Sequence, residues 1–435
     1  MTELNFKHKT LSDWLIYLER LHPKVIDMGL DRVNQVKTLL NLTPRFPIIT
    51  VGGTNGKGST CIMMESIMSR AGYQVGCYIS PHLLRYNERI RINRQEVSDK
   101  ELCEAFSVVE VARMKNDVSL TYFEFGTLAA MQLFIEAKVD IVILEVGLGG
   151  RLDAVNVFDA DCAVLTSIDL DHIDYLGDTR EKIGFEKAGI FRRGKAAICS
   201  ELNIPVSVSN QAELIGADFM RIGEHFGHSD YKNSWNYWSV KSKYLSLPHP
   251  ALRGVYQLRN ASACLTALNV FKDSLPITLN DIRQGLLDTE LPGRFQVLPG
   301  RPITLLDVAH NPSAVRALGI NLAHMDRYRK TYAVFAVLKD KDMIGIVQAL
   351  MSKIDVWLVA SIGLLRGASA DEIVQVLKLA GIKNNGEAVF MFPDPVAAYV
   401  FACKKATEDD RICVFGSFHT VSEIMRYRNL VKYHQ

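Results

Sequence analysis

Apolar runs alternate with amphipathic segments along most of the chain. The runs at 47–51, 75–80, 140–147 and 162–168 are short and predominantly apolar, and patterns of helical periodicity lie between them. Strands that are apolar on both faces are typical of a parallel sheet covered by helices on either side. The N-terminal part of the chain is therefore predicted to be an α/β domain with a mostly parallel sheet flanked by helices.

Two further helices and one irregular region complete this part. TLSDWLIYLERL (10–21) has apolar residues at helical spacing, and Ser12 is its expected N-cap. YQLRNASACLTALNVF (256–271) has a clear helical pattern. Residues 203–250 are richer in aromatic and polar side chains, which favours short antiparallel strands or an excursion from the main fold.

A second α/β rhythm begins near residue 301. It contains the apolar runs ITLLDVAH, KTYAVFAVL, DVWLVAS, AVFMF and RICVFGS, with helical segments between them. The stretch before it, 288–302, has three prolines and two glycines, which is typical of a connection. We predict a first domain over 1–290, a linker over 291–300 and a smaller, Rossmann-like α/β domain over 301–435.

A glycine-rich loop, VGGTNGKGST (51–60), joins the first strand to a helix. Closely spaced glycines let the backbone fold around an anion, and the helix N-terminus adds N–H donors and a positive dipole. The common phosphate loop has a hydroxyl residue directly after its lysine, whereas Lys57 is followed by Gly58, and Ser59 and Thr60 come later. The context predicts a P-loop-type nucleotide site, and the alternative is a strand-to-helix turn without a ligand.

Chemically capable side chains follow three of the predicted strands. Ser80 ends one strand, Glu145 lies near the end of another, and His172 follows a third. The carboxyl ends of parallel strands meet at one edge of a sheet, where ligands bind. A hydroxyl, a carboxylate and an imidazole near a nucleotide suit Mg²⁺, although imidazole is an unusual ligand for this ion. Each residue alone also has a purely structural explanation.

Composition limits the remaining possibilities. A chain of 435 residues with 48% hydrophobic and 23% charged residues is expected to form two or three globular domains. The net charge of +2 gives no reason to expect nucleic acid or a membrane surface as a partner. The eight scattered cysteines include no CxxC pair, and no signal peptide or apolar span is present, so we expect a cytoplasmic protein with reduced thiols.

Taken together, the motifs resemble those of one family. GTNGKGS, SPHL, EVGLGGRLDA, EKAGIF, LRN, PGRFQ and DVAHNP occur in this order, and the resemblance covers nearly the whole chain. The chain is similar to the Mur ligase superfamily, specifically to its folylpolyglutamate synthases. IDMGLDRV, LTYFEFGTL and DVAHNP are most similar to the bifunctional bacterial enzymes, which are also dihydrofolate synthases.

The resemblance implies an ATP-dependent ligase that joins L-glutamate to dihydropteroate and to folates through an acyl phosphate. It implies ATP and two Mg²⁺ ions as cofactors, an N-terminal ATP-binding domain, a C-terminal glutamate-ligase domain, and a monomer. Two alternatives stay open: a folylpolyglutamate synthase alone, and a P-loop nucleotide-binding switch or regulatory protein. A switch would need a hydroxyl residue directly after Lys57 and a guanine-reading NKxD motif, and both are missing.

The resemblance also assigns residues to the cofactors. Lys57, Lys187 and His172 are implied in catalysis, and Lys187 matches a lysine that is carbamylated in many Mur ligases. The Mg²⁺ ligands would be Ser80, Glu145 and His172. The residues implied in ATP binding are Asn55, Gly56, Lys57, Gly58, Ser59, Thr60, Asn260, Arg294 and Asp307.

Three segments are implied in binding the pterin acceptor. Phe123 could stack on the flat pterin ring, although its position also fits a core aromatic. The loop reads DAVN where many relatives have DATN, so Val155 lacks a hydroxyl and any role for that position is in doubt. The residues implied in acceptor binding are Asp27, Met28, Thr121, Tyr122, Phe123, Glu124, Leu152, Asp153 and Ala154.

Overall fold

The chain forms two compact units, each with its own sheet. The computed structural model describes residues 9–325, 328–382 and 386–433. The units comprise Met1–Ala251 with Leu258–Thr289, and Leu252–Gln257 with Glu290–Gln435. Among the described residues, no helix is both long enough and apolar enough to cross a membrane.

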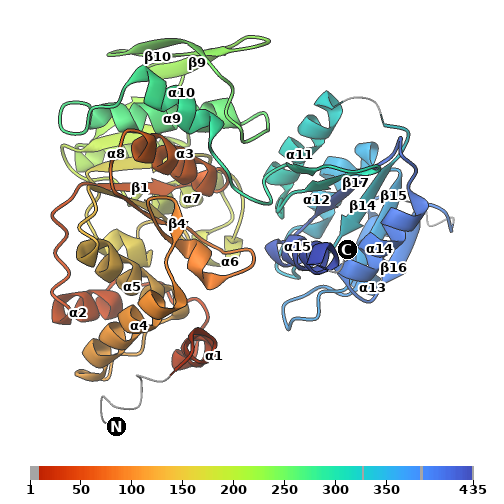
Figure 1. Cartoon of the computed structure of the whole chain (residues 1–435), viewed down its shortest axis with the longest axis horizontal. Helices are drawn as coiled ribbons and strands as arrows, with labels where there is room; N and C mark the ends of the chain where they lie inside the picture. Colours follow the sequence, from red (N-terminus) through yellow and green to blue (C-terminus); the bar gives the residue numbers. More distant parts are fainter. Residues whose placement is uncertain (1–8, 326–327, 383–385, 434–435) are drawn as a thin grey trace. The chain divides into compact units, whose positions relative to one another are not determined.

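The first unit is built on an eight-stranded sheet of order β4-β3-β2-β5-β1-β6-β7-β8 (Figure 1). The six strands from β2 to β8 in this order pair in parallel, whereas β3 and β4 are antiparallel additions at one edge. The mostly parallel sheet is therefore confirmed. The strands are β1 Ile48–Gly52, β2 Val75–Tyr78, β3 Ile90–Ile92, β4 Gln95–Glu96, β5 Ile141–Glu145, β6 Cys162–Leu165, β7 Ala196–Cys199 and β8 Asp218–Arg221.

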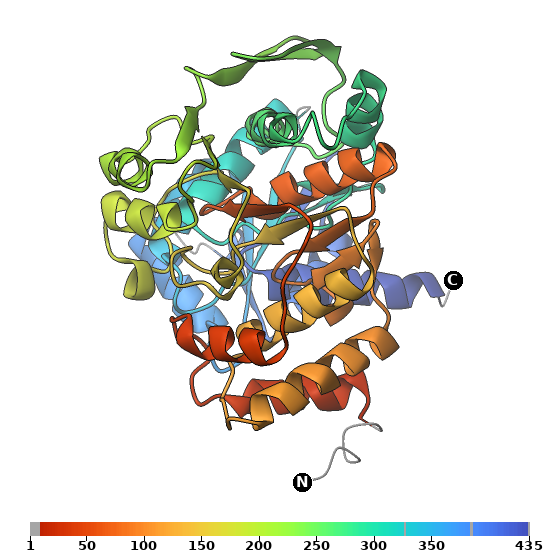
Figure 2. The same ribbon diagram turned by 90° about the vertical axis from the view of Figure 1, so that its left-hand side faces the viewer.

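Helices cover both faces of this sheet. Helices α3, α9 and α10 lie on one face, and α1, α2, α4 and α5 lie on the other (Figures 1 and 2). The central strands are buried along their whole length, as their apolar sequences predict. The helices are α1 Leu11–Leu21, α2 Asp31–Leu39, α3 Lys57–Arg70, α4 Asp99–Met114, α5 Tyr122–Glu136, α6 Ile173–Leu176, α7 Arg180–Ala188, α8 Val206–Ile215, α9 Gln257–Val270 and α10 Leu279–Leu287.

The first helix begins with a different cap from the one predicted. Thr10 is the N-cap of α1: its hydroxyl accepts from the Asp13 N–H at 3.2 Å, and the Asp13 carboxylate accepts from the Thr10 N–H at 2.9 Å. This reciprocal pair is a capping box. The prediction that Ser12 caps this helix is wrong, because Asp13 completes the box with Thr10 and leaves Ser12 inside the first turn.

The irregular region of the first unit is a small antiparallel sheet of order β11-β10-β9. Its strands are β9 Phe226–Asp230, β10 Trp235–Ser239 and β11 Lys243–Leu247. Two tyrosines of this sheet form hydrogen bonds with side chains of α9. Tyr237 bonds Thr266 at 3.0 Å, and Tyr244 bonds Asn269 at 2.7 Å. The expectation of short antiparallel strands in 203–250 is confirmed.

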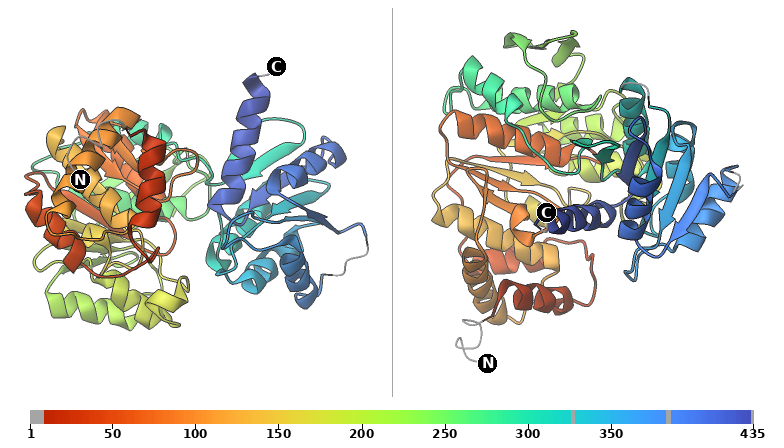
Figure 3. Two further views of the ribbon diagram at one scale, coloured as in Figure 1. Left: turned by 90° about the horizontal axis from the view of Figure 1, so that it is seen from below. Right: turned by 45° about the vertical axis from the view of Figure 1, so that its right-hand side comes forward.

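The second unit has a six-stranded sheet of order β12-β13-β17-β14-β15-β16, with helices on both faces (Figure 3). All neighbours pair in parallel except β12, which is antiparallel to β13 and falls inside the predicted linker 291–300. The strands are β12 Gln296–Leu298, β13 Ile303–Leu306, β14 Thr331–Phe335, β15 Val356–Ala360, β16 Val389–Phe392 and β17 Arg411–Phe415. The helices are α11 Pro312–His324, α12 Met343–Leu350, α13 Ala370–Leu379, α14 Pro395–Lys405 and α15 Phe418–Tyr433.

The register of the first sheet places four chain segments at one edge. Tyr78 of β2 pairs with Leu144 of β5, Val51 of β1 pairs with Glu145, and Gly52 pairs with Leu165 of β6. The residues that follow these strands therefore emerge side by side at the carboxyl edge, which is where ligands bind in sheets of this kind.

Candidate active site

The glycine-rich loop forms a tight turn between β1 and α3. Gly53 and Gly56 have φ angles of 141° and 91°, and Gly56 is the N-cap of α3. A Cβ atom on Gly53 would overlap Thr166 Oγ1, and a Cβ on Gly56 would lie 2.8 Å from Asn260 Oδ1. Only glycine fits at these two positions. The N–H groups at the start of this 14-residue helix make the loop a favourable place for an anion.

Hydroxyl groups hold the loop in this shape. Thr166 Oγ1 donates to the Asn55 carbonyl at 2.7 Å, and Ser167 Oγ accepts from the Asn55 N–H at 2.9 Å. Thr60, predicted to bind ATP, donates its hydroxyl to the Gly56 carbonyl at 2.9 Å inside the first turn of α3. The sequence reasoning missed Thr166 and Ser167, although they stand at the end of a predicted strand, where loop contacts are expected.

Two lysine side chains meet at one backbone carbonyl of the loop. Lys57 Nζ donates to the Gly53 carbonyl at 3.2 Å and to the Thr54 carbonyl at 3.3 Å, and Lys187 Nζ donates to the Gly53 carbonyl at 2.9 Å. Lys187 is only 4% exposed. Burial, together with the nearby charge of Lys57, lowers the pKa of Lys187 to about 7, against the opposing effect of Asp171 and Asp153. An anion in the loop would relieve this crowding of positive charge.

The predicted metal ligands lie at the ends of three strands. The Ser80 N–H donates to Glu145 Oε2 at 2.9 Å, so these two residues lie together, and Glu145 is 4% exposed. His172 follows β6 in the left-handed conformation, with its N–H donating to Asp171 Oδ1 at 2.9 Å. Within the described ranges, no group of three or more His, Cys, Asp or Glu residues is arranged to hold a metal ion. A hydroxyl, a buried carboxylate and an imidazole suit a divalent cation by their chemistry.

The implied acceptor residues are linked at the start of α5. Thr121 caps this helix, and its N–H donates to Glu124 Oε2 at 2.7 Å. Arg32 of α2 donates to Glu124 Oε1 at 3.1 Å and pairs with Asp27 Oδ2 at 2.9 Å. Arg32 thus connects two of the implied acceptor segments. The sequence reasoning missed it, since one arginine early in a helix carries no distinctive signal.

Phe123 brings a third segment to the same place. Its ring stacks on Tyr78 with centroids 5.7 Å apart. A Cβ on Gly147 would lie 2.7 Å from Phe123 Cζ, and a Cβ on Gly149 would lie 3.4 Å from Met28 Cε. The loop after β5 therefore packs against both Phe123 and Met28. Stacking of Phe123 on a pterin stays a prediction.

Asp153 organises the loop after β5. Its carboxylate accepts from the N–H groups of Leu148 at 2.8 Å and Val155 at 3.1 Å. Burial raises the pKa of Asp153 to about 7, against the lowering effect of these backbone bonds. Val155 is fully buried, so its apolar side chain serves packing. Leu152 and Ala154 flank Asp153 and take their positions from this loop.

Two of the implied ATP-binding residues lie in the second unit, at the end of β13 and shortly before β12. The Asp307 carboxylate accepts from the N–H groups of Phe295 at 2.9 Å and Ala309 at 2.8 Å. The Arg294 guanidinium lies over the Phe418 ring, 4.9 Å from its centroid, and the His310 ring lies 6.1 Å from the same ring. Burial raises the pKa of Asp307, against the charge of Arg294.

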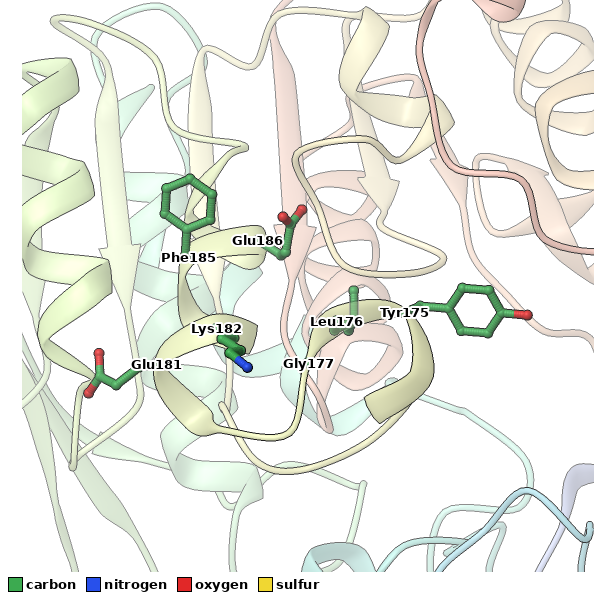
Figure 4. A pocket seen from close by; sticks show the side chains of 7 residues that line it. All are labelled: Tyr175, Leu176, Gly177, Glu181, Lys182, Phe185 and Glu186. Atoms are coloured by element: carbon green, nitrogen blue, oxygen red, sulfur yellow. The ribbon is translucent and has the colours of Figure 1, made fainter.

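A pocket opens between α6 and α7 (Figure 4). Its wall includes Glu186, whose carboxylate pairs with Arg151 at 2.8 Å. His172 directly precedes α6 and Lys187 directly follows Glu186, but neither lines the pocket. The lining residues are Tyr175, Leu176, Gly177, Glu181, Lys182, Phe185 and Glu186.

Family models match both units. Residues 51–268 match the Mur ligase middle domain, and residues 293–418 match the Mur ligase glutamate ligase domain. The chain is 43% identical to the dihydrofolate synthase/folylpolyglutamate synthase of Escherichia coli, over 95% of this chain and 94% of that protein. It is 42% identical to the protein of the same name from Haemophilus influenzae, over 95% and 96%.

Solved structures agree with these matches. The chain is similar to E. coli FolC in complex with DHPP and ADP, with a TM-score of 0.92, 42% identity, and 98% and 99% of the two chains covered. It is also similar to the bifunctional folylpolyglutamate synthase/dihydrofolate synthase of Yersinia pestis complexed with AMPPNP and Mn ion. There the TM-score is 0.89 and the identity 44%, over 97% and 98% of the chains. The resemblance drawn from the motifs is confirmed.

The lowered pKa of Lys187 predicts a pH dependence of stability. Between pH 7 and 10.5 the unfolded chain binds a proton at Lys187 and the folded chain does not, so this residue's contribution to the free energy of unfolding rises with pH. In carbonate-free buffer, urea unfolding should show the free energy of unfolding of wild type falling by about 1.4 kcal/mol per pH unit, relative to that of Lys187→Met, as the pH is lowered from 9.5 to 7.5. Lys195→Met, at a half-exposed lysine, is the matched control and should show no such slope. Parallel curves for wild type and Lys187→Met would contradict the assignment.

Proposed function

The chain belongs to the dihydrofolate synthase/folylpolyglutamate synthase family of Mur ligases, and is an ATP- and glutamate-dependent ligase; we propose how its residues divide that work. The acceptors are dihydropteroate, which becomes dihydrofolate, and folates, which become folylpolyglutamates. The observation that carries the proposal is the loop in which Lys57 and Lys187 both donate to the Gly53 carbonyl.

The loop from Asn55 to Thr60 binds the phosphates of ATP. Helix α3 offers its N-terminal N–H groups to the phosphates, and Lys57 places a positive charge beside the transferred phosphoryl group. Asn260 stands beside Gly56, where it supports the loop and contacts the nucleotide. We assign Arg294 and Asp307 to nucleotide binding as well.

Ser80, Glu145 and His172 would hold a Mg²⁺ ion. Such an ion would supply positive charge against the phosphates of ATP. The Ser80 N–H bond to Oε2 holds the Glu145 carboxylate in place at the end of β5. A divalent ion is supported by the Mn ion in the Y. pestis relative.

The reaction has two steps. An acceptor carboxylate oxygen attacks the γ-phosphorus of ATP, the bond to the β-phosphate oxygen breaks, and an acyl phosphate and ADP result. The glutamate amine then attacks the acyl carbon, inorganic phosphate leaves with its bridging oxygen, and the amine loses a proton. Lys57 and the helix N-terminus stabilise the charge that develops in the first step, chiefly by positioning and electrostatics.

The acceptor binds where three segments converge. They are Asp27 with Met28, Thr121 with the residues that follow it, and the Leu152–Ala154 loop. Support comes from the contacts of Arg32 with Asp27 and Glu124, and from the packing of the loop on Phe123 and Met28. Because dihydropteroate and reduced folates share the pterin ring, one pocket serves both acceptors. We place the protein in the cytoplasm, which its eight free cysteine thiols support, and we propose that it is a monomer.

ADP release should require every substrate at once. Purified protein is expected to release ADP only when ATP, Mg²⁺, L-glutamate and an acceptor are all present, with dihydropteroate and tetrahydrofolate each supporting turnover. A coupled assay that omits one component at a time measures this. ADP release without acceptor and glutamate would contradict the ligase assignment and favour a nucleotide switch. Turnover with tetrahydrofolate but not with dihydropteroate would indicate a folylpolyglutamate synthase without the dihydrofolate synthase activity.

Lys187 carries a carbamate in the active enzyme. Its pKa of about 7 leaves much of the amine neutral, as addition to CO₂ requires; a nitrogen–carbon bond forms and a proton is released. The carbamate keeps one N–H for the Gly53 carbonyl and converts a cation beside Lys57 into an anion. That anion would provide a ligand for a second Mg²⁺.

The carbamate can be observed directly. After equilibration with ¹³C-bicarbonate, wild type should show a carbamate carbon resonance that disappears in Lys187→Met and persists in Lys195→Met. Identical spectra for wild type and Lys187→Met would refute the modification.

A further inference from the structure

Arg32 forms two sets of contacts with two separate segments. Its guanidinium pairs with Asp27 Oδ2 at 2.9 Å and donates to the Asp27 carbonyl at 2.6 Å. On its other side it donates to Glu124 Oε1 at 3.1 Å. Arg32 is the second residue of α2, and Glu124 lies in the first turn of α5 on the same face of the sheet (Figure 1). One planar side chain thus fixes the distance between the two segments.

The two oxygens of Asp27 differ in their surroundings. Oδ2 contacts both Arg32 at 2.9 Å and His22 Nε2 at 3.1 Å. Oδ1 has a longer contact, 3.6 Å, with Lys24 Nζ, whose side chain is 69% exposed. Oδ2 is therefore anchored, and Oδ1 is the oxygen that a ligand can reach by displacing an exposed ammonium group. The Asp27 side chain is 25% exposed, so it is accessible.

His22 is held as firmly as the carboxylate it supports. Its Nδ1 lies 2.9 Å from Ser119 Oγ, and Ser119 Oγ donates to the Leu21 carbonyl at 3.1 Å. Nε2 faces the Asp27 carboxylate, which only accepts, so Nε2 is the donor in this contact.

Neighbouring positive charges keep the Asp27 carboxylate ionised, so that it can accept hydrogen bonds. Partial burial acts to raise its pKa, but the His22 hydrogen bond and the charges of Arg32 and Lys24 lower it overall. An ionised carboxylate with one oxygen held only by an exposed lysine suits a ring that presents N–H donors, as the aminopyrimidine half of a pterin does.

We propose that Arg32 and His22 are positioning residues: they anchor Oδ2 of Asp27 so that Oδ1 receives an N–H donor of the acceptor's pterin ring. Arg32 also ties this carboxylate to the start of α5, where further implied acceptor residues lie. The inference rests on the proposed function, because it assumes that a pterin occupies this region. Lysine can replace Arg32 only in part, since a single ammonium group lacks the planar fork that reaches both carboxylates.

The test compares Michaelis constants for the separate substrates. Arg32→Met should raise the KM for dihydropteroate and for tetrahydrofolate on the order of tenfold, while the KM values for ATP and glutamate stay within about twofold. Arg32→Lys should recover part of the loss. Arg70→Met is the matched control, because it removes another arginine–aspartate ion pair of the first unit, with Asp288, and should leave all KM values unchanged.

A double-mutant cycle shows whether Arg32 acts through Asp27. Asp27→Asn should raise the acceptor KM, and adding Arg32→Met should raise it little further, because the two side chains form one unit. Independent, multiplicative effects, or a KM rise shared equally by ATP, would overturn the positioning role. Failure of wild type to turn over any pterin acceptor would overturn the proposed function as well, and wild-type turnover with an unchanged acceptor KM in Arg32→Met would overturn this inference alone.

Discussion

Two lysine side chains donate to one backbone carbonyl, that of Gly53, and the rest of the site is arranged around this pair. The cost of burying Lys187 beside Lys57 is expressed in its lowered pKa. Such an arrangement is stable when an anion completes it, and the N-terminus of α3 favours the same ligand. ATP phosphates and a carbamate are the two anions that this chemistry accommodates, and both belong to the proposed reaction.

The parallel sheet determines which residues emerge at the same edge as the glycine-rich loop. Because β2, β5, β1 and β6 are neighbours that run in one direction, Ser80, Glu145, the loop and His172 all follow strands that end at the same edge. Residues that are far apart in sequence therefore share one location without a continuous motif. The displaced hydroxyls of the loop fit this picture: Thr60 bonds the Gly56 carbonyl within α3, and we propose that Ser80 supplies the hydroxyl for the metal ion.

The sequence predicted the features that depend on local pattern or motif. Buried strands, the mostly parallel sheet and the family followed from apolar runs and ordered motifs. The N-cap of α1 was misassigned because Ser12 and Thr10 are equally good caps, and only the reciprocal bond with Asp13 separates them. Arg32, Thr166 and Ser167 were missed because their roles arise from contacts between distant segments. Strand β12 was hidden in a stretch rich in proline and glycine.

The proposed reaction transfers the γ-phosphoryl group of ATP to a carboxylate rather than to water. Single-turnover reaction of an acceptor labelled with ¹⁸O in both carboxylate oxygens tests it most directly, by mass spectrometry of the phosphate released. The account predicts one ¹⁸O atom in each phosphate, because the bridging oxygen of an acyl phosphate leaves with phosphorus, and one ¹⁸O in the amide formed. Unlabelled phosphate with both labels retained in the acceptor would contradict it.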